Sequence, residues 1–301
     1  MGVMIGGVME LQNNVLDTAL LIEGGGMQGV YAAAVVETLL KEGIFIDYVA
    51  GISAGATNLL NYVSRDYPRG RKMFIELADD PMFSPWKSYI RGKGLVDTDF
   101  DSYDADGILP FDYETFMANP AKIRIGAVDA DTGETVWWGK DSLTGVDDLM
   151  KKKMASSSAP IYMPPFKIGD RMYIDGSFGE GGGIALPIAK RDGYTKFFAV
   201  ITQERGFVKR QEIHSPVRDL LFHKHPATVQ ATLGRPSQYD TTREELLELE
   251  RQGKACLFFP EHRIVGNLSR NAAKQQAAYD TGLAQAHQEV PRWKEFLGLS
   301  S

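Results

Sequence analysis

The sequence of 301 residues contains one cysteine, Cys256, and no apolar run as long as the roughly 18 residues of a membrane-spanning helix. A single cysteine excludes an intramolecular disulfide and a zinc site made of cysteines. Cys256 itself lies in a short apolar run, which is typical of a buried strand. The apolar N-terminal segment lacks the positive charges of a signal peptide. We therefore expect a cytoplasmic protein, with peripheral association with membranes as an open alternative.

Positive charge is also scarce. The chain carries 33 Lys and Arg against 39 Asp and Glu, a formal net charge of −6, so no basic surface suggests nucleic acid as a partner. Hydrophobic residues make up 44% of the chain, enough for a buried core. Because internal repeats, low-complexity runs and linkers are absent, we expect residues 1–301 to form one domain. Its functional motifs lie in 18–205, and a helical C-terminal part covers 206–301.

A serine lies between two glycines in the run Gly51-Ile52-Ser53-Ala54-Gly55. The apolar run before it and the small residues after it match the G-x-S-x-G elbow, a sharp turn from a strand into a helix that exposes a serine hydroxyl. The helix N-terminus directs its partial positive charge at the serine, which suits an anionic transition state. The pattern predicts that Ser53 is a nucleophile. Gly51 and Gly55 are positions where a side chain would collide with neighbouring elements.

A glycine-rich segment, Gly24 to Gly29, follows a predicted strand at 18–22 and precedes a predicted helix at 30–41. The next strand ends at Gly51, so the chain opens with a βαβ unit, which predicts parallel strands. The glycines match a dinucleotide-binding fingerprint, but that use requires an acidic residue at the end of the second strand, and Asp47 precedes this strand. We favour the other use of such a loop, an oxyanion hole made of glycine amides.

The rest of the chain alternates predicted strands and helices, except for residues 205–242, which show no clear pattern. The expected strands cover 122–129, 134–139, 171–174, 196–202 and 255–259, and the expected helices cover 146–158, 181–191, 242–252 and 269–288. Residues 64–119 are rich in aromatic residues and methionine, which fits either a wall for an acyl chain or helices packed over the sheet. For Lys151, Lys152 and Lys153 we favour a solvated helix face over contact with anionic lipids.

Three motifs stand in order along the chain: Gly24 to Gly29, Gly51 to Gly55, and Asp175-Gly176-Ser177. Together they resemble the patatin-like phospholipase family, in its bacterial branch. The resemblance implies a three-layer α/β/α fold with a mainly parallel central sheet, and an acyl-ester hydrolase of the lipase, phospholipase A or lysophospholipase type. It implies these roles: nucleophile for Ser53, proton acceptor for Asp175, oxyanion hole for Gly24, Gly25 and Gly26, and motif positions for Gly29, Gly51, Gly55 and Gly176.

Two positions depart from the pattern of the family. Gln28 replaces the usual Arg or Lys, which we expect to affect rate or head-group preference, and Ser177 replaces a usual Gly or Ala, which we expect to be tolerated. The implied mechanism needs no metal and no cofactor, and the implied partner is a lipid or another acyl ester. Two other interpretations stay open. One is an α/β-hydrolase with a triad of Ser53, Asp175 and His262, and the other is a relative that binds lipid without hydrolysing it.

Overall fold

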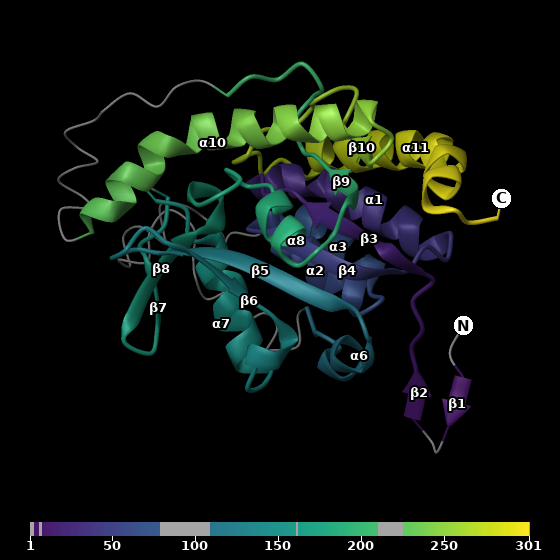
Figure 1. Ribbon diagram of the computed structural model, residues 1–301, viewed down its shortest axis with the longest axis horizontal. Coiled ribbons are helices and arrows are strands. Elements are labelled where there is room, and N and C mark those ends of the chain that lie inside the picture. Colours follow the sequence, from purple (N-terminus) through teal and green to yellow (C-terminus); the bar gives the residue numbers. More distant parts are fainter. Residues whose placement is uncertain (1–2, 6–7, 79–108, 161, 210–224, 301) are drawn as a thin grey trace.

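The computed structural model describes residues 3–5, 8–78, 109–160, 162–209 and 225–300. Its centre is a sheet of the strands β3 (Val15–Ile22), β4 (Ile46–Ile52), β5 (Lys122–Asp129), β6 (Thr135–Trp138), β7 (Phe166–Ile168), β8 (Arg171–Asp175), β9 (Lys196–Val200) and β10 (Ala255–Phe258). The pairs β10–β9, β9–β3, β3–β4 and β4–β5 are parallel, whereas β6 and β8 run antiparallel to β5, and β7 antiparallel to β8. A separate hairpin of β1 (Val3–Ile5) and β2 (Val8–Glu10) lies apart from this sheet (Figure 1).

Strands β4 and β8 share one edge of β5. On β5, Gly126 is opposite both Ile52 of β4 and Trp137 of β6, so β4 and β6 lie on opposite edges. The next residue, Ala127, is opposite both Val136 of β6 and Asp175 of β8, which places β8 on the edge that β4 occupies. Strands β4 and β8 therefore meet end to end, and the last residues of both lie side by side.

Helices cover both faces of the sheet (Figure 1). They are α1 (Gly29–Lys41), α2 (Ala54–Val63), α3 (Tyr67–Arg71), α6 (Tyr113–Ala118), α7 (Val146–Ser157), α8 (Leu186–Arg191), α10 (Pro226–Arg251) and α11 (Ala272–Leu297), with short 3₁₀ helices η1 (Gly26–Gln28), η4 (Lys140–Ser142) and η5 (Gly176–Phe178) and a π-helix, η2 (Lys72–Glu76). Alternate strand residues face opposite sides, as in any strand. Leu20 and Val49 pack with α1, α2, α7 and α11, whereas Leu21 and Ala50 pack with α8 and α10. The fold is thus a three-layer α/β/α arrangement with a mostly parallel sheet, as expected.

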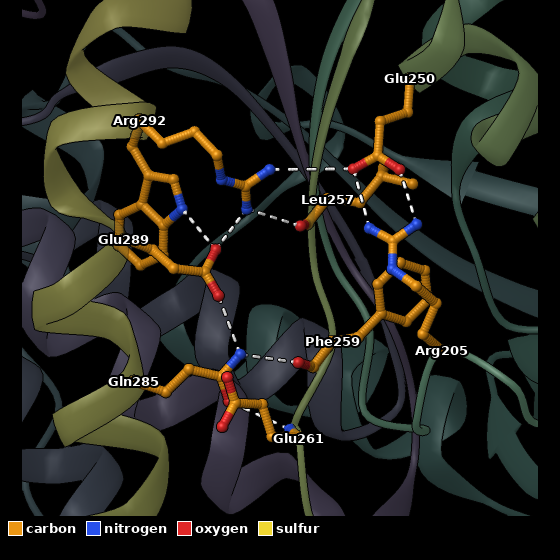
Figure 2. Close-up of polar contacts among 9 residues, drawn as sticks. Arg205, Glu250, Leu257, Phe259, Glu261, Gln285, Glu289 and Arg292 are labelled. Atoms are coloured by element: carbon orange, nitrogen blue, oxygen red, sulfur yellow. Dashed lines mark hydrogen bonds and ion pairs between the residues drawn. The ribbon is translucent and has the colours of Figure 1, made fainter.

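Side chains from α11 satisfy the exposed edge of β10, which pairs only with β9 among the described strands (Figure 2). The guanidinium of Arg292 donates to the carbonyl of Leu257 at 2.9 Å, and the Gln285 amide donates to the carbonyl of Phe259 at 2.8 Å. On the other side of this strand Arg205 binds Glu250 of α10 with two hydrogen bonds of 2.7 and 3.0 Å, and Arg292 reaches across to Glu250 at 3.8 Å. An unpaired strand edge is a site for aggregation, so these contacts both close the sheet and fasten the two long C-terminal helices to it.

The structure corrects three helix boundaries. The helix expected at 181–191 begins only at Leu186, because Gly181, Gly182 and Gly183 have φ values of 81°, 63° and 122° and form turns. The helix expected at 242–252 begins at Pro226, and the one expected at 269–288 extends to Leu297. Both long helices contain an internal proline, and α10 buries threonines rather than large apolar residues along much of its length. The sequence of α10 therefore lacks the apolar periodicity that would reveal the helix, whereas the buried positions of α11 recur every three or four residues, which is why most of that helix was predicted.

Trp293 is the largest fully buried side chain of α11, and it contacts the rings of Phe198 and Phe258 edge-on at centroid distances of 5.2 and 6.3 Å. We expect Trp293→Ala to lower the free energy of unfolding by about 3–5 kcal/mol, because it leaves a cavity between α11 and the sheet. Urea unfolding measures this loss. Gln288→Ala, at an exposed position of the same helix, should change it by less than about 0.5 kcal/mol. Equal losses in both variants would mean that α11 is not anchored through Trp293.

Candidate active site

Ser53 sits in a strained turn between β4 and α2. Its φ of 56° and ψ of −125° lie outside the regions that a non-glycine residue adopts readily. The N–H of Ser53 donates to the hydroxyl of Ser156 on α7 at 2.9 Å, and that hydroxyl donates to the carbonyl of Gly126 at 2.6 Å. This bridge through Ser156, which the sequence did not reveal, ties the elbow to β5 and α7. It helps to hold the strained conformation in place.

The glycines around the elbow stand where backbones nearly touch. A side chain at Gly55 would place its Cβ 2.1 Å from the carbonyl oxygen of Ile22, and one at Gly51 would lie 2.5 Å from the carbonyl oxygen of Gly55. At Gly24 the Cβ would lie 2.9 Å from the carbonyl oxygen of Ile52 and 3.1 Å from Cβ of Ser53. The glycine-rich loop after β3 therefore lies directly against the serine elbow.

The glycines of this loop differ in what their N–H groups bind. The N–H of Gly24 donates to the carbonyl of Gly183 at 3.2 Å, so it is engaged within the protein. Gly25 and Gly26 stand at the start of η1, and their N–H groups have no bonded acceptor among the described residues. Both of these residues line a cavity together with Ser53, and Gly24 is not among the residues that line it. Of the three glycines expected to form an oxyanion hole, Gly25 and Gly26 have amides available for that purpose.

Asp175 lies at the end of β8, where that strand meets β4. Its side chain is 4% exposed, Ser53 is 7% exposed, and both line the same cavity. Because β4 runs parallel to β5 and β8 runs antiparallel to it, the two strands approach head-on, and the two residues meet where the strands end. One carboxylate oxygen, Oδ1, accepts hydrogen bonds from the N–H of Ser177, at 2.8 Å, and from its hydroxyl. Ser177 thus orients the carboxylate, a role that simple tolerance of a small residue did not predict.

His262 is placed differently. It lies exposed in the loop after β10, where its backbone carbonyl accepts a hydrogen bond from the hydroxyl of Tyr31 at 3.1 Å. The described residues that line the cavity include no histidine. The geometry therefore gives no support to the alternative in which His262 completes a triad.

The cavity has a volume of about 240 Å³ and a largely apolar wall. The larger apolar side chains in that wall include Met73, Phe74, Leu77, Met154, Met163 and Phe178. The first three belong to the aromatic-rich segment 64–119, for which both an acyl wall and packed helices were considered. They form part of a wall, whereas Phe116 is buried in the core. Residues 79–108 of that segment lie outside the described residues.

The structure partly corrects the expectation for the three consecutive lysines. Lys151 is exposed, as expected, but Lys152 and Lys153 are only 6% and 2% exposed. Lys152 binds Asp148 and the carbonyl of Ser142, and Lys153 lines the cavity. Gln28 is fully buried and accepts a hydrogen bond from the amide of Gln203 at 2.9 Å. Since Gln28 is not among the cavity residues, the structure provides no contact through which it would select a head group.

Glu23 is a buried acidic residue that contacts the glycine-rich loop through Thr202. It is 3% exposed, and Oε2 accepts hydrogen bonds from the N–H of Thr202 at 2.5 Å and from its hydroxyl at 3.0 Å. A Cβ at Gly25 would lie 2.6 Å from that hydroxyl, so Thr202 links Glu23 to the loop. Burial, the largest influence, raises the pKa of Glu23, although the hydrogen bonds from Thr202 and the charge of Lys209 act in the opposite direction.

Within the described parts of the chain, no group of three or more His, Cys, Asp or Glu side chains is placed to hold a metal ion. Among the helices of those same segments, none combines the length and the apolarity that crossing a membrane requires.

Comparisons with known proteins agree with the motifs. A family model described as patatin-like phospholipase matches residues 20–187, and a model described as a domain of unknown function (DUF6363) matches residues 225–298. The uncharacterized protein YjjU of Escherichia coli (strain K12) is 30% identical over 83 residues, which is 27% of this chain and 23% of that protein. The solved structure of VipD from Legionella pneumophila superposes with a TM-score of 0.48 and 13% identity, covering 90% of this chain and 66% of VipD. The chain thus matches less than two thirds of the length of either protein.

The buried Glu23 generates a prediction about stability and pH. Glu23→Gln keeps an oxygen acceptor for Thr202 but removes the titrating group. Because the pKa of Glu23 in the folded state lies above its ordinary value of 4.5, the folded protein keeps a proton that the unfolded chain releases. This contribution to stability is present below pH 4.5 and is lost as the pH rises through the raised pKa. The unfolding free energy of Glu23→Gln relative to wild type should therefore increase with pH over this range.

Urea unfolding at a series of pH values tests this expectation. Glu134→Gln serves as the control, because Glu134 is exposed in the turn between β5 and β6. Its difference from wild type should stay nearly constant with pH. If the difference between Glu23→Gln and wild type also stayed constant with pH, the pKa of Glu23 would not be raised in the folded protein.

Proposed function

Because the chain belongs to the patatin-like phospholipase family, a family of lipid hydrolases, we propose that it cleaves fatty acyl esters as a lipase, phospholipase A or lysophospholipase. Ser53 is the nucleophile and Asp175 is the proton acceptor. One observation carries this proposal: a strained serine, a buried carboxylate and two glycine amides without acceptors line the same apolar cavity. A serine ester hydrolase needs these components, and they come from segments far apart in the chain.

The reaction begins when Asp175 takes the proton of the Ser53 hydroxyl as Oγ attacks the carbonyl carbon of the ester. Both hydrogen bonds from Ser177 reach Oδ1 of Asp175, which leaves Oδ2 for this proton. The negative charge that develops on the carbonyl oxygen is stabilised by the N–H groups of Gly25 and Gly26. Losing one donor of this kind typically slows a reaction by about 10²–10³-fold.

Collapse of the tetrahedral intermediate breaks the bond to the alcohol, which leaves with the proton from Asp175, and Ser53 stays acylated. Water then attacks the acyl group, Asp175 again accepts a proton, and the fatty acid is released as Ser53 recovers its hydrogen. The apolar wall around Met73, Phe74 and Met154 suits the acyl chain, since burying each methylene group is worth about 0.8 kcal/mol.

Substitution of the two catalytic residues tests the dyad. Ser53→Ala removes the nucleophile and Asp175→Asn removes the proton acceptor, so each should abolish nearly all hydrolysis of a p-nitrophenyl ester. The double variant should be little worse than either, because residues that act as one unit are not additive. A fluorophosphonate probe should label Ser53 in the wild type. Absence of label and of turnover would favour a relative that binds lipid without hydrolysing it.

His262→Ala distinguishes the dyad from a triad. We expect a rate within about tenfold of wild type, equivalent to about 1.4 kcal/mol on the barrier, because His262 lies outside the cavity lining. Loss of a triad histidine instead costs about 10⁴-fold or more. A melting curve for each variant separates loss of chemistry from loss of folding. A folded His262→Ala protein without activity would overturn the role given to Asp175.

Calcium should have no influence on the reaction, since the described residues provide no cluster of acidic side chains to bind it. Ester hydrolysis measured with excess chelator should match that measured with added calcium. If the chelator abolished activity and calcium alone restored it, the serine mechanism would be wrong.

A further inference from the structure

The catalytic cavity is lined by three cationic side chains from different parts of the chain: Lys153 on α7, Arg235 on α10, and Arg270 just before α11. Among the described residues that line it, only Asp175 is acidic. The described lining residues thus carry more positive than negative charge, in a wall that is otherwise mostly apolar. Charged groups in such surroundings act strongly on a bound ligand, because little water screens them.

Arg235 is the cation whose hydrogen bonds are incomplete. Its Nε atom is buried and has no hydrogen-bond partner among the described residues. The guanidinium lies 4.6 Å from the centroid of the Phe178 ring, and Phe178 follows Asp175 by three positions in η5. This cation–π contact holds Arg235 in the cavity that Asp175 also lines, without using its N–H donors.

Two other cationic side chains in this part of the protein, Lys209 and Arg270, have lowered pKa values. The pKa of Lys209 is lowered to about 8, first by burial and then by repulsion from Arg235, although Glu23, Asp240 and Asp175 act in the opposite direction. Burial lowers the pKa of Arg270 as well. An anion entering the cavity would relieve this repulsion, and the planar fork of Arg235 could bind two of its oxygen atoms.

We propose that Arg235 is a specificity-determining residue that selects acyl esters with a net negative charge close to the scissile ester, as in an acyl glycerol phosphate. This inference rests on the proposed function and adds to it the substrate class. Esters with a neutral or zwitterionic head group are disfavoured, because they lack the net negative charge that would pair with the guanidinium of Arg235.

The same inference gives a role to the C-terminal segment. Arg235, Asn267, Leu268 and Arg270 line the cavity, and all four fall within residues 225–298, the range matched by the domain of unknown function. They lie outside the matched patatin-like range of 20–187. The C-terminal segment therefore completes the catalytic cavity and supplies its selectivity, while the N-terminal part supplies the chemistry.

A binding experiment tests the proposal without turnover. The probes are a 1-O-alkyl glycerol 3-phosphate and the matching 1-O-alkyl glycerophosphocholine, whose ether bonds resist hydrolysis. Calorimetry on the wild-type protein below the micelle concentration should show tighter binding of the phosphate monoester. Arg235→Gln should weaken its binding by about 10- to 100-fold, the range expected for a lost charged hydrogen bond, and Arg235→Lys should keep part of it.

Kinetics with the ester counterparts, lysophosphatidate and lysophosphatidylcholine of one chain length, provide the second readout. The ratio of their kcat/KM values should favour lysophosphatidate in the wild type and collapse in Arg235→Gln. Arg251→Gln is the matched control, because Arg251 is an exposed arginine of the same helix that pairs with Glu248. It should leave the ratio unchanged, and melting curves confirm that each variant is folded.

The outcomes separate this inference from the proposed function. Equal binding of the two ether lipids, or a parallel loss for both substrates in Arg235→Gln, overturns the role of Arg235 even if Ser53 reacts with a fluorophosphonate. Selective binding of the phosphate monoester that depends on Arg235 supports that role even if neither ester is hydrolysed, in which case only the proposed function fails. If Arg235→Gln does not fold, Arg235→Lys and the wild-type comparison decide the matter.

Discussion

The site depends on the way two strands meet along a single edge of β5. Strand β4 ends at Ile52, opposite Gly126, and β8 arrives from the other direction and ends at Asp175, opposite Ala127. Because hydrogen bonding to β5 sets both registers, the residue after β4 and the last residue of β8 lie next to each other. A shift of one residue in either register would reverse the face that each side chain occupies. The backbone pairing of β5 therefore determines whether the side chains of Ser53 and Asp175 lie close to each other.

The parallel pairing of β3 with β4 brings the glycine-rich loop next to Ser53. Ile22 is opposite Gly51, so the loops that follow the two strands emerge together at one edge of the sheet. They lie so close that a Cβ atom at Gly55 would be only 2.1 Å from the carbonyl oxygen of Ile22. The contacts below them, from Glu23 through Thr202 and from Ser53 through Ser156, use buried hydrogen bonds to hold this arrangement. Buried polar groups that are fully bonded make a site rigid, which suits the oxyanion hole that we propose, because its donors must be in place before the reaction begins.

The two long C-terminal helices connect stability with the site. Helix α11 satisfies carbonyl groups on the edge strand β10 through Arg292 and Gln285, as Figure 2 shows, and it buries Trp293 against the sheet. Helix α10 packs on the opposite face of the sheet. Its residue Arg235 lines the cavity. Anchoring of these helices at β10 thus also helps to set the position of a charge in the first half of α10. A defect in the C-terminal packing would affect the cavity as well as the fold.

The sequence by itself determined the local units: the strand, glycine loop and helix around Gly24 to Gly29, the elbow at Ser53, and the Asp175-Gly176-Ser177 turn. These units are visible because short-range sterics require glycine or a small residue at particular positions. The sequence could not show that the N–H of Gly24 donates a hydrogen bond to the carbonyl of Gly183, or that Ser177 donates hydrogen bonds to Asp175. Nor could it show that Lys153 and Arg235 line the cavity. It also missed most of α10, whose buried threonines lack an apolar period. Only the tertiary structure decided these points. Gly24 and Gly183 are distant in the sequence and meet because of how the elements pack, and the same packing sets where the side chains of Ser177, Lys153 and Arg235 point.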